Sequence, residues 1–374
     1  MKKLLWLIII IGGLAVIILS LVYRPAAPAE KIYVAVEGDG LIAVIDPARQ
    51  KVIKKIDLAI EHDGGLLPYA PHNVQVSPDG RSVWVTANAG PHQNHQTGSL
   101  TPRARAHSDE VESGESDEMI IIDPSTDEIT ARRQLGKERH LAHVILTPDN
   151  LYAYITAQEA GKIYKINARA LTVEKVITLP SNSEPHGLRI APDGQTAYVA
   201  MLGSKSLGVL NLQTDQIGFL PLGGQAVQTG VTPDRQKVVV SLYDKKQLAV
   251  YEPTTKKLSF IDLPANARGP IQMYPTADSR FVYLADQGYY FNQPVGRSVF
   301  KIDLTTNQIV KTIETGSGPH GVILSSGNRF VYVTNLLDGD VAAIDTDTDE
   351  LIWKVTVGKE PNGISSWPGQ PIGK

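Results

Sequence analysis

The feature that most constrains the fold is an internal repeat. An apolar residue followed by an Asp-type turn occurs seven times, at Ile45-Asp46-Pro47, Ile122-Asp123-Pro124, Ile166-Asn167-Ala168, Leu210-Asn211-Leu212, Tyr251-Glu252-Pro253, Ile302-Asp303-Leu304 and Ile344-Asp345-Thr346. From Asp123 onward the turn residues are 44, 44, 41, 51 and 42 residues apart, which is about the length of a four-stranded propeller blade. A Pro-Asp turn also recurs, at residues 78–79, 148–149, 192–193 and 233–234.

Each Pro-Asp turn leads into alternating apolar and polar residues, as in residues 82–86, which is the period of a strand. The N-terminal part supplies three strands of a unit, at residues 32–36, 41–45 and 52–58, and the C-terminus supplies only an inner strand at 362–366. Together these segments complete one blade. The sequence therefore predicts an all-β, seven-bladed propeller whose last blade is closed by the N- and C-terminal strands.

An uncharged run of 20 residues, from Leu4 to Tyr23, follows Lys2 and Lys3. Such a run is long enough to cross a bilayer, and the two lysines favour a cytoplasmic N-terminus. We expect residues 1–30 to be a signal anchor with a short linker, spanning the membrane at about 4–23. Residues 31–374 would then be held at a bacterial-type cell membrane, in the periplasm or outside the cell. Cleavage after Ala27 or Ala29 would instead release a secreted protein.

The segment Val331-Tyr332-Val333-Thr334-Asn335, with Pro185-His186-Gly187 and Pro319-His320-Gly321, resembles the YVTN-repeat seven-bladed propellers, including the YncE-like proteins. More distant similarity is to the N-terminal propeller of nitrous oxide reductase and to the haem d1 propellers. The resemblance covers about residues 31–374 and implies the fold. It does not imply one function, because related propellers carry haem, copper or streptogramin-lyase chemistry.

Composition excludes several of these functions. The chain has no cysteine, so a cupredoxin-type copper site, a disulfide and a thiolate metal site are all ruled out. Nucleic-acid binding is known in the YncE-like group, but Lys+Arg 36 against Asp+Glu 39 gives a net charge of -3 and no basic stripe. We therefore do not expect a nucleic-acid partner. Phosphate-loop, nucleophile-elbow and zinc-protease motifs are also absent.

Three insertions relative to the plain repeat fall on one face of the predicted ring. They lie near residues 61–63, at about residues 89–117 in the first blade, and at residues 286–293. Because loops on a rigid scaffold often carry function, this loop-rich face is the predicted site. Tyr289 and Tyr290 in the third insertion are candidate ligand-binding residues, since adjacent aromatic side chains gain little from solvent.

Histidines gather at the predicted channel mouth on the same face. When the seven units are aligned, His72, His186 and His320 occupy one position of the innermost strand, and His143 occupies the next. Neutral imidazoles without thiolates suit Cu, Zn or Fe, so these four residues, with His92 and His95 of the first insertion, are the candidate metal ligands. The alternative is that Pro-His-Gly is an ordinary turn sequence whose ring packs on the next blade.

Polar residues at the same two aligned positions complete the candidate ligand-binding set: Asn73, Gln228, Gln272 and Asn362. We expect a membrane-anchored binding module that engages a small ligand, a metal or a protein partner at the loop-rich face and channel mouth. The alternative is a metal-dependent enzyme or redox protein, of lyase, lactonase or copper type, that uses the channel-mouth histidines. We favour binding over catalysis, and the sequence assigns no catalytic residue.

Overall fold

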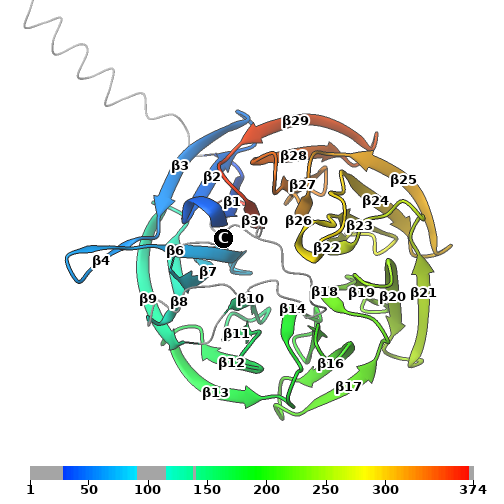
Figure 1. The fold of residues 1–374 in the computed structure, drawn as a ribbon, viewed down its shortest axis with the longest axis horizontal. Helices are drawn as coiled ribbons and strands as arrows, with labels where there is room; N and C mark the ends of the chain where they lie inside the picture. The colour runs from blue at the N-terminus through cyan, green and yellow to red at the C-terminus, as the bar shows by residue number, and fades with distance from the viewer. Residues whose placement is uncertain (1–27, 91–114, 138–139, 370–374) are drawn as a thin grey trace, which may run out of the picture.

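The computed structural model describes residues 28–90, 115–137 and 140–369. Seven four-stranded antiparallel sheets surround a central channel as the blades of a propeller (Figure 1). This confirms the predicted all-β, seven-bladed architecture. In the part of the chain that the structure describes, no helix is long and apolar enough to cross a membrane. The expected anchor at residues 4–23 lies outside the described residues.

Blades 1 to 6 are each formed by four consecutive strands, with the first at the channel and the fourth at the rim (Figure 1). Blade 1 contains β6 (Tyr69–Val76), β7 (Val83–Ala89), β8 (Asp117–Asp123) and β9 (Glu128–Gly136). Blades 2 and 3 contain β10 (Leu141–Leu146), β11 (Tyr152–Ala157), β12 (Lys162–Asn167), β13 (Thr172–Thr178), β14 (Pro185–Ile190), β15 (Thr196–Met201), β16 (Ser206–Asn211) and β17 (Ile217–Pro221). Blades 4 to 6 contain β18 (Ala226–Val231), β19 (Val238–Leu242), β20 (Gln247–Glu252), β21 (Lys257–Asp262), β22 (Pro270–Pro275), β23 (Phe281–Asp286), β24 (Ser298–Asp303), β25 (Gln308–Glu314), β26 (Pro319–Leu324), β27 (Phe330–Asn335), β28 (Asp340–Asp345) and β29 (Glu350–Thr356).

Blade 7 joins the two ends of the described chain. Its inner strand is β30 (Pro361–Trp367), which pairs antiparallel with β1 (Lys31–Val36), and β2 (Leu41–Asp46) and β3 (Lys51–Asp57) complete the sheet. The Trp367 side chain is 2% exposed and donates from Nε1 to the carbonyl oxygen of Gly80 in blade 1 at 2.8 Å. The predicted closure by N- and C-terminal strands is therefore confirmed, and it leaves no open edge between the first and last blades.

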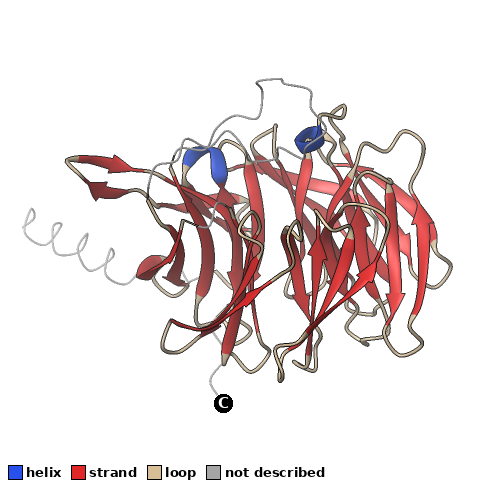
Figure 2. Ribbon diagram, turned by 60° about the horizontal axis from the view of Figure 1, so that its bottom comes forward, coloured by secondary structure: helices blue, strands red, loops and turns tan. Residues whose placement is uncertain are grey.

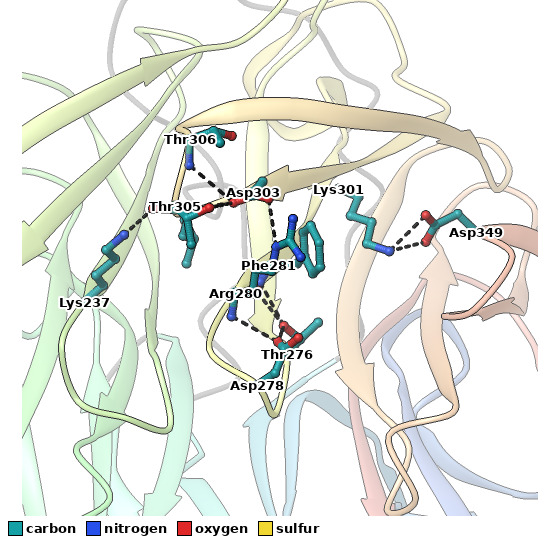
Figure 3. A network of polar contacts seen from close by, with 11 residues as sticks. Lys237, Thr276, Asp278, Arg280, Phe281, Lys301, Asp303, Thr305, Thr306 and Asp349 are labelled. Carbon is teal, nitrogen blue, oxygen red and sulfur yellow. Dashed lines mark hydrogen bonds and ion pairs between the residues drawn. The ribbon is translucent and has the colours of Figure 1, made fainter.

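The turns that carry the repeat are held by Asp side chains, as Figure 3 shows for blade 5. Asp303 Oδ1 accepts hydrogen bonds from the Thr305 N–H at 2.8 Å and the Thr305 hydroxyl at 2.5 Å. Asp278 Oδ1 accepts from the Thr276 hydroxyl at 2.5 Å and from the Arg280 N–H at 3.0 Å. These local bonds explain why Asp recurs at both kinds of turn, since its carboxylate replaces backbone partners that a tight turn leaves unpaired.

The interior is a set of apolar layers between neighbouring blades. Between blades 7 and 1, for example, Tyr33, Val44, Val85 and Ile120 are all fully buried in one cluster. Alternate residues of each central strand face opposite neighbours, so strands buried on both sides are apolar throughout. This packing makes the ring a rigid frame for the channel.

Two predicted insertions add structure on one face of the ring. Residues near 61–63 form a hairpin of β4 (Ile60–His62) and β5 (Gly65–Leu67), which projects beyond the rim (Figure 1). The insertion at 286–293 contains the short 3-10 helix η2 (Tyr289–Phe291), on the same face as η1 (Glu37–Asp39) (Figure 2). Most of the first-blade insertion, residues 91–114, lies outside the described residues.

Candidate metal site

A β-bulge lies at the aligned histidine position of the innermost strand in all seven blades. In blade 3, for example, Pro185 pairs with Met201, but the next registered pair is Leu188 with Val199. The same shift occurs in the other six sheets. A bulge changes the direction of the side chains next to it. Histidines at two successive aligned positions, which would face opposite sides of a regular strand, can therefore approach each other.

Hydroxyl groups on the second strand of several blades fix the backbone at these bulges. The Thr156 hydroxyl donates to the His186 carbonyl oxygen of the next blade at 2.7 Å and accepts from the His143 N–H of its own blade at 3.0 Å. Thr86 and Thr334 make the corresponding pair of contacts in blades 1 and 6. One hydroxyl thus ties two histidine-bearing strands together, which positions His143 relative to His186.

The structure groups His72, His143 and His186, from three consecutive blades. One ring nitrogen of each lies within 4.8 Å of the other two, and all three side chains are buried. A point central to three atoms at that separation would be ~2.8 Å from each, against the ~2.0–2.1 Å of a Zn–N bond. Small side-chain rotations inward would therefore bring all three nitrogens to bonding distance of one ion.

Two of these imidazoles have a hydrogen-bond acceptor beside Nδ1, which favours the tautomer with the lone pair on Nε2. His186 donates from Nδ1 to the Val227 carbonyl oxygen at 2.9 Å, so the neutral ring has its lone pair on Nε2. His72 Nδ1 lies 3.2 Å from Glu37 Oε1, and donation to this carboxylate leaves the His72 lone pair on Nε2 as well. A carbonyl or carboxylate behind a ligating histidine is the usual outer partner at protein metal sites.

His143 is the least satisfied of the three side chains. It is fully buried, and neither of its ring nitrogens has a hydrogen-bond partner among the described residues. Burial, and then the neighbouring His186 and His72, hold its pKa well below the usual value. Burial, and then His72, lower the pKa of His186 to about 3. The rings of His143 and His186 are thus neutral, as metal ligands must be, and an ion would satisfy a buried nitrogen of His143 that otherwise costs stability.

His320 does not belong to this group. Its Nδ1 accepts a hydrogen bond from Gln287 Nε2 at 2.8 Å, and Gln287 Oε1 accepts from the Tyr290 N–H at 3.3 Å, which fixes the direction of the amide. Burial and then His72 lower the pKa of His320 to about 3, against smaller opposing effects of Glu37 and Asn362. The neutral ring therefore carries its proton on Nε2. Of the four predicted channel-mouth candidates, His72, His143 and His186 are grouped, and His320 lies outside the group.

A small cavity separates His320 from the histidine group. It is lined by His72, His186, Gln158, Tyr290 and His320 and by the apolar side chains of Leu202, Val227, Ile271 and Phe291. It has room for about one water molecule. Tyr290 of η2 lines it, and η2 is held by the stack of Phe291 on Tyr243, whose ring centroids are 3.5 Å apart. The cavity therefore lies against two members of the histidine group, His72 and His186.

Among the other candidates, Asn362 lies beside the group, with Nδ2 3.2 Å from His72 Nδ1. Asn362 donates from Nδ2 to Glu37 Oε2 at 2.7 Å, and Asn73 Oδ1 accepts from the Val144 N–H at 3.2 Å. Gln228 and Gln272 are buried, and within the described ranges their Nε2 atoms have no hydrogen-bond partner. The Tyr289 ring centroid is 5.9 Å from that of Tyr290. His92 and His95 lie outside the described residues.

Sequence reasoning missed two side chains at the site, Glu37 and His140. Glu37 is the first residue after the second strand of its blade, the place that Gln158, Leu202, Tyr243 and Gln287 occupy in other blades. Aligning this position as well as the innermost strand would have found it. His140 precedes β10 with φ 74°, and its ring centroid is 4.2 Å from that of His72. No periodicity marks His140, because it lies in a connector.

The fold and the channel define the class: a seven-bladed β-propeller with a histidine group in its channel mouth. A sequence model of the YNCE-like beta-propeller family matches residues 88–371, so the chain belongs to that family. A search of the curated proteins gave no match.

Two solved structures show the same fold. Kuenenia stuttgartiensis hydrazine synthase matches with TM-score 0.62 and 16% identity, over 82% of this chain and 91% of that chain. A protein from Lactobacillus plantarum matches with TM-score 0.66 and 15% identity, over 90% and 98%. At these identities the likeness concerns the fold alone.

Proposed function

We propose that this YncE-like propeller is a binding protein that holds one divalent transition-metal ion at His72, His143 and His186. The observation that carries the proposal is the arrangement of three buried imidazoles, of which two have a hydrogen-bond acceptor beside Nδ1 and the third, His143, has no described hydrogen-bond partner. Three imidazoles with no thiolate suit Zn²⁺ or Cu²⁺ and leave a further coordination position open.

The surroundings support a cation at this place. Glu37 is 2% exposed and lies against His72, so it places a negative charge next to the proposed ion. Without that carboxylate, the full charge of a divalent ion would be buried among neutral groups, which is unfavourable. Glu37 therefore both orients His72 and offsets part of the metal charge.

The cavity favours binding over catalysis on an organic substrate. Its size, about one water molecule, leaves no space for a substrate beside the ion, and the Tyr290 side chain lines it. A lyase or lactonase would need η2 and its stacked Phe291 to move away from Tyr243. No described feature favours that movement, so the enzyme alternative receives less support.

The test is metal binding by protein purified without a histidine tag. Calorimetric titration with Zn²⁺ and with Cu²⁺ is expected to show one tight site per chain. The double variant His143→Ala/His186→Ala is expected to lose this site, and Glu37→Gln to weaken it by about 10- to 100-fold. A tight site that survives unchanged in the double variant would contradict the proposal.

Two controls separate this site from other histidines. His62 lies in the projecting β4–β5 hairpin with a 38% exposed side chain, so His62→Ala should bind as the unaltered chain does. His92→Ala/His95→Ala tests the predicted contribution of the first-blade insertion, and a loss of affinity there would add those residues to the site.

The proposed location is outside the cytoplasm, with the chain anchored by residues 4–23. The support is the uncharged run of 20 residues after Lys2 and Lys3. Protease added to intact spheroplasts should degrade the propeller, and carbonate washing should leave it in the membrane fraction. Protection from protease would contradict the orientation, and release by carbonate would indicate a cleaved signal.

A further inference from the structure

His320 lines the same cavity as His72 and His186, although it is not one of the grouped residues. Gln287 Nε2 donates to His320 Nδ1 at 2.8 Å, and the amide cannot be reversed without losing the bond from the Tyr290 N–H to Gln287 Oε1. A neutral imidazole whose Nδ1 accepts a hydrogen bond has its proton on Nε2. His320 therefore presents an N–H group, where His72 and His186 present lone pairs.

No described atom accepts this N–H within hydrogen-bond distance, although the Asn362 side chain lies close enough to raise the pKa of the ring. The His320 side chain is 3% exposed, and Nε2 has no hydrogen-bond partner among the residues that the structure describes. A buried donor without an acceptor is unfavourable, because it has lost its hydrogen bonds to water. Since His320 lines the same cavity as His72 and His186, an acceptor bound in that cavity would satisfy the donor.

We infer that the open coordination position of the ion takes a water-sized anion, such as hydroxide or fluoride, and that His320 donates a hydrogen bond to it from Nε2. This inference rests on the proposed metal site. The cavity sets the size of the anion, because it has room for about one water molecule. The apolar side chains of Val227 and Ile271 on its wall strengthen a hydrogen bond to an anion by excluding water.

Gln287 is the positioning residue, because it sets which His320 nitrogen carries the proton. Gln287→Glu would place a carboxylate at His320 Nδ1 and reverse the tautomer, so Nε2 would present a lone pair to the cavity. The two tautomers of His320 would therefore do different things: the Nε2–H tautomer donates a hydrogen bond to an anion, and the Nδ1–H tautomer can ligate the ion through Nε2.

The experiment uses fluoride titration of the Cu²⁺-loaded full-length protein, followed by electron paramagnetic resonance. Every variant is measured at saturating Cu²⁺, so that fluoride affinity is read on fully loaded protein. Fluoride is expected to add a superhyperfine splitting to the copper signal of the unaltered chain. In His320→Phe the fluoride affinity should fall by about tenfold or more, as expected for losing a hydrogen bond to a charged group.

Gln287→Glu supplies the second, independent measurement. Its fluoride affinity should also fall, and its copper spectrum should gain the signature of a further imidazole nitrogen. His62→Ala should match the unaltered chain in both readouts. Fluoride affinity that is unchanged in His320→Phe and in Gln287→Glu overturns the inference while leaving the metal site intact. Failure of the protein to bind Cu²⁺ overturns the proposed function, and the inference with it.

Discussion

As pH falls, the metal-free protein should lose stability at pH values well above those at which its ordinary carboxylates take up protons. His186 and His320 have pKa values of about 3 in the folded chain, and the pKa of His143 is also well lowered. An unfolded histidine has a pKa of about 6.5. Below that pH these histidines bind protons in the unfolded chain but stay unprotonated in the folded chain. The stability from these neutral histidines is thus fully present above about pH 6.5 and is lost as pH falls towards 3.

The magnitude follows from linkage. Each such histidine lowers the free energy of unfolding by about 1.4 kcal/mol per pH unit below 6.5, or about 2 kcal/mol at pH 5. Asp286 and Glu184 act in the opposite direction, because burial raises their pKa values, so the folded chain binds their protons more readily. Three histidines should outweigh these two carboxyl groups, and the net loss at pH 5 would be a large part of a typical domain's stability.

Urea unfolding in the presence of a chelator, at several pH values between about 7.5 and 5, measures this dependence. His320→Phe should reduce the slope by about one proton, since one buried histidine is gone. His62→Ala, in the exposed hairpin, should leave the slope unchanged. A free energy of unfolding that is constant over this range, or an unaltered slope in His320→Phe, would refute the argument that these rings are neutral when folded.

Three further predictions concern how the ring holds the site. Thr156→Val removes the bonds to the His186 carbonyl and the His143 N–H, and should cost about 1–2 kcal/mol in urea unfolding and weaken Zn²⁺ binding in calorimetry. Gly187→Ala should cost roughly 1–3 kcal/mol, because a Cβ there would lie 2.8 Å from Gln228 Cα; Gly218→Ala, with nothing within 4 Å, is the control. Trp367→Ala should lower the free energy of unfolding by about 3–5 kcal/mol and lower the melting temperature, since it leaves a cavity where blade 7 packs on blade 1. Losses below ~0.5 kcal/mol in any of the three would contradict these contacts.

The repeat made most of the fold predictable. Asp303 and Asp278 mark turns because their carboxylates accept local backbone and hydroxyl donors, and such bonds depend on neighbours in sequence. Closure by Lys31–Val36 and Pro361–Trp367 was also predictable, because each terminal segment lacks the strands that the other supplies. The hairpin Ile60–Leu67 was predicted only as an insertion relative to the repeat, and not as a pair of strands, since its pairing has no counterpart in the other blades.

The site was predicted less completely, for a physical reason. Alignment identified His72, His143 and His186, but grouping them required the bulge, which places successive aligned residues in one space. Alignment alone favoured His320 because it shares the position of His72 and His186. What separates His320 from them is a hydrogen bond from Gln287, a residue in an insertion that the plain repeat does not contain.

The site depends on an asymmetry imposed on a sevenfold frame. All seven blades bring the bulge position to the channel, yet blades 4 and 5 place Val227 and Ile271 there, whereas blades 1 to 3 supply the grouped histidines. An ion bound by the histidines would therefore lie off the channel axis, against one wall. Across the cavity, Val227 and Ile271 are apolar, whereas His320 and Tyr290 carry polar groups. Because His320 lines the cavity beside His72 and His186, the proposed anion would depend on this one side chain and on the tautomer that Gln287 selects for it.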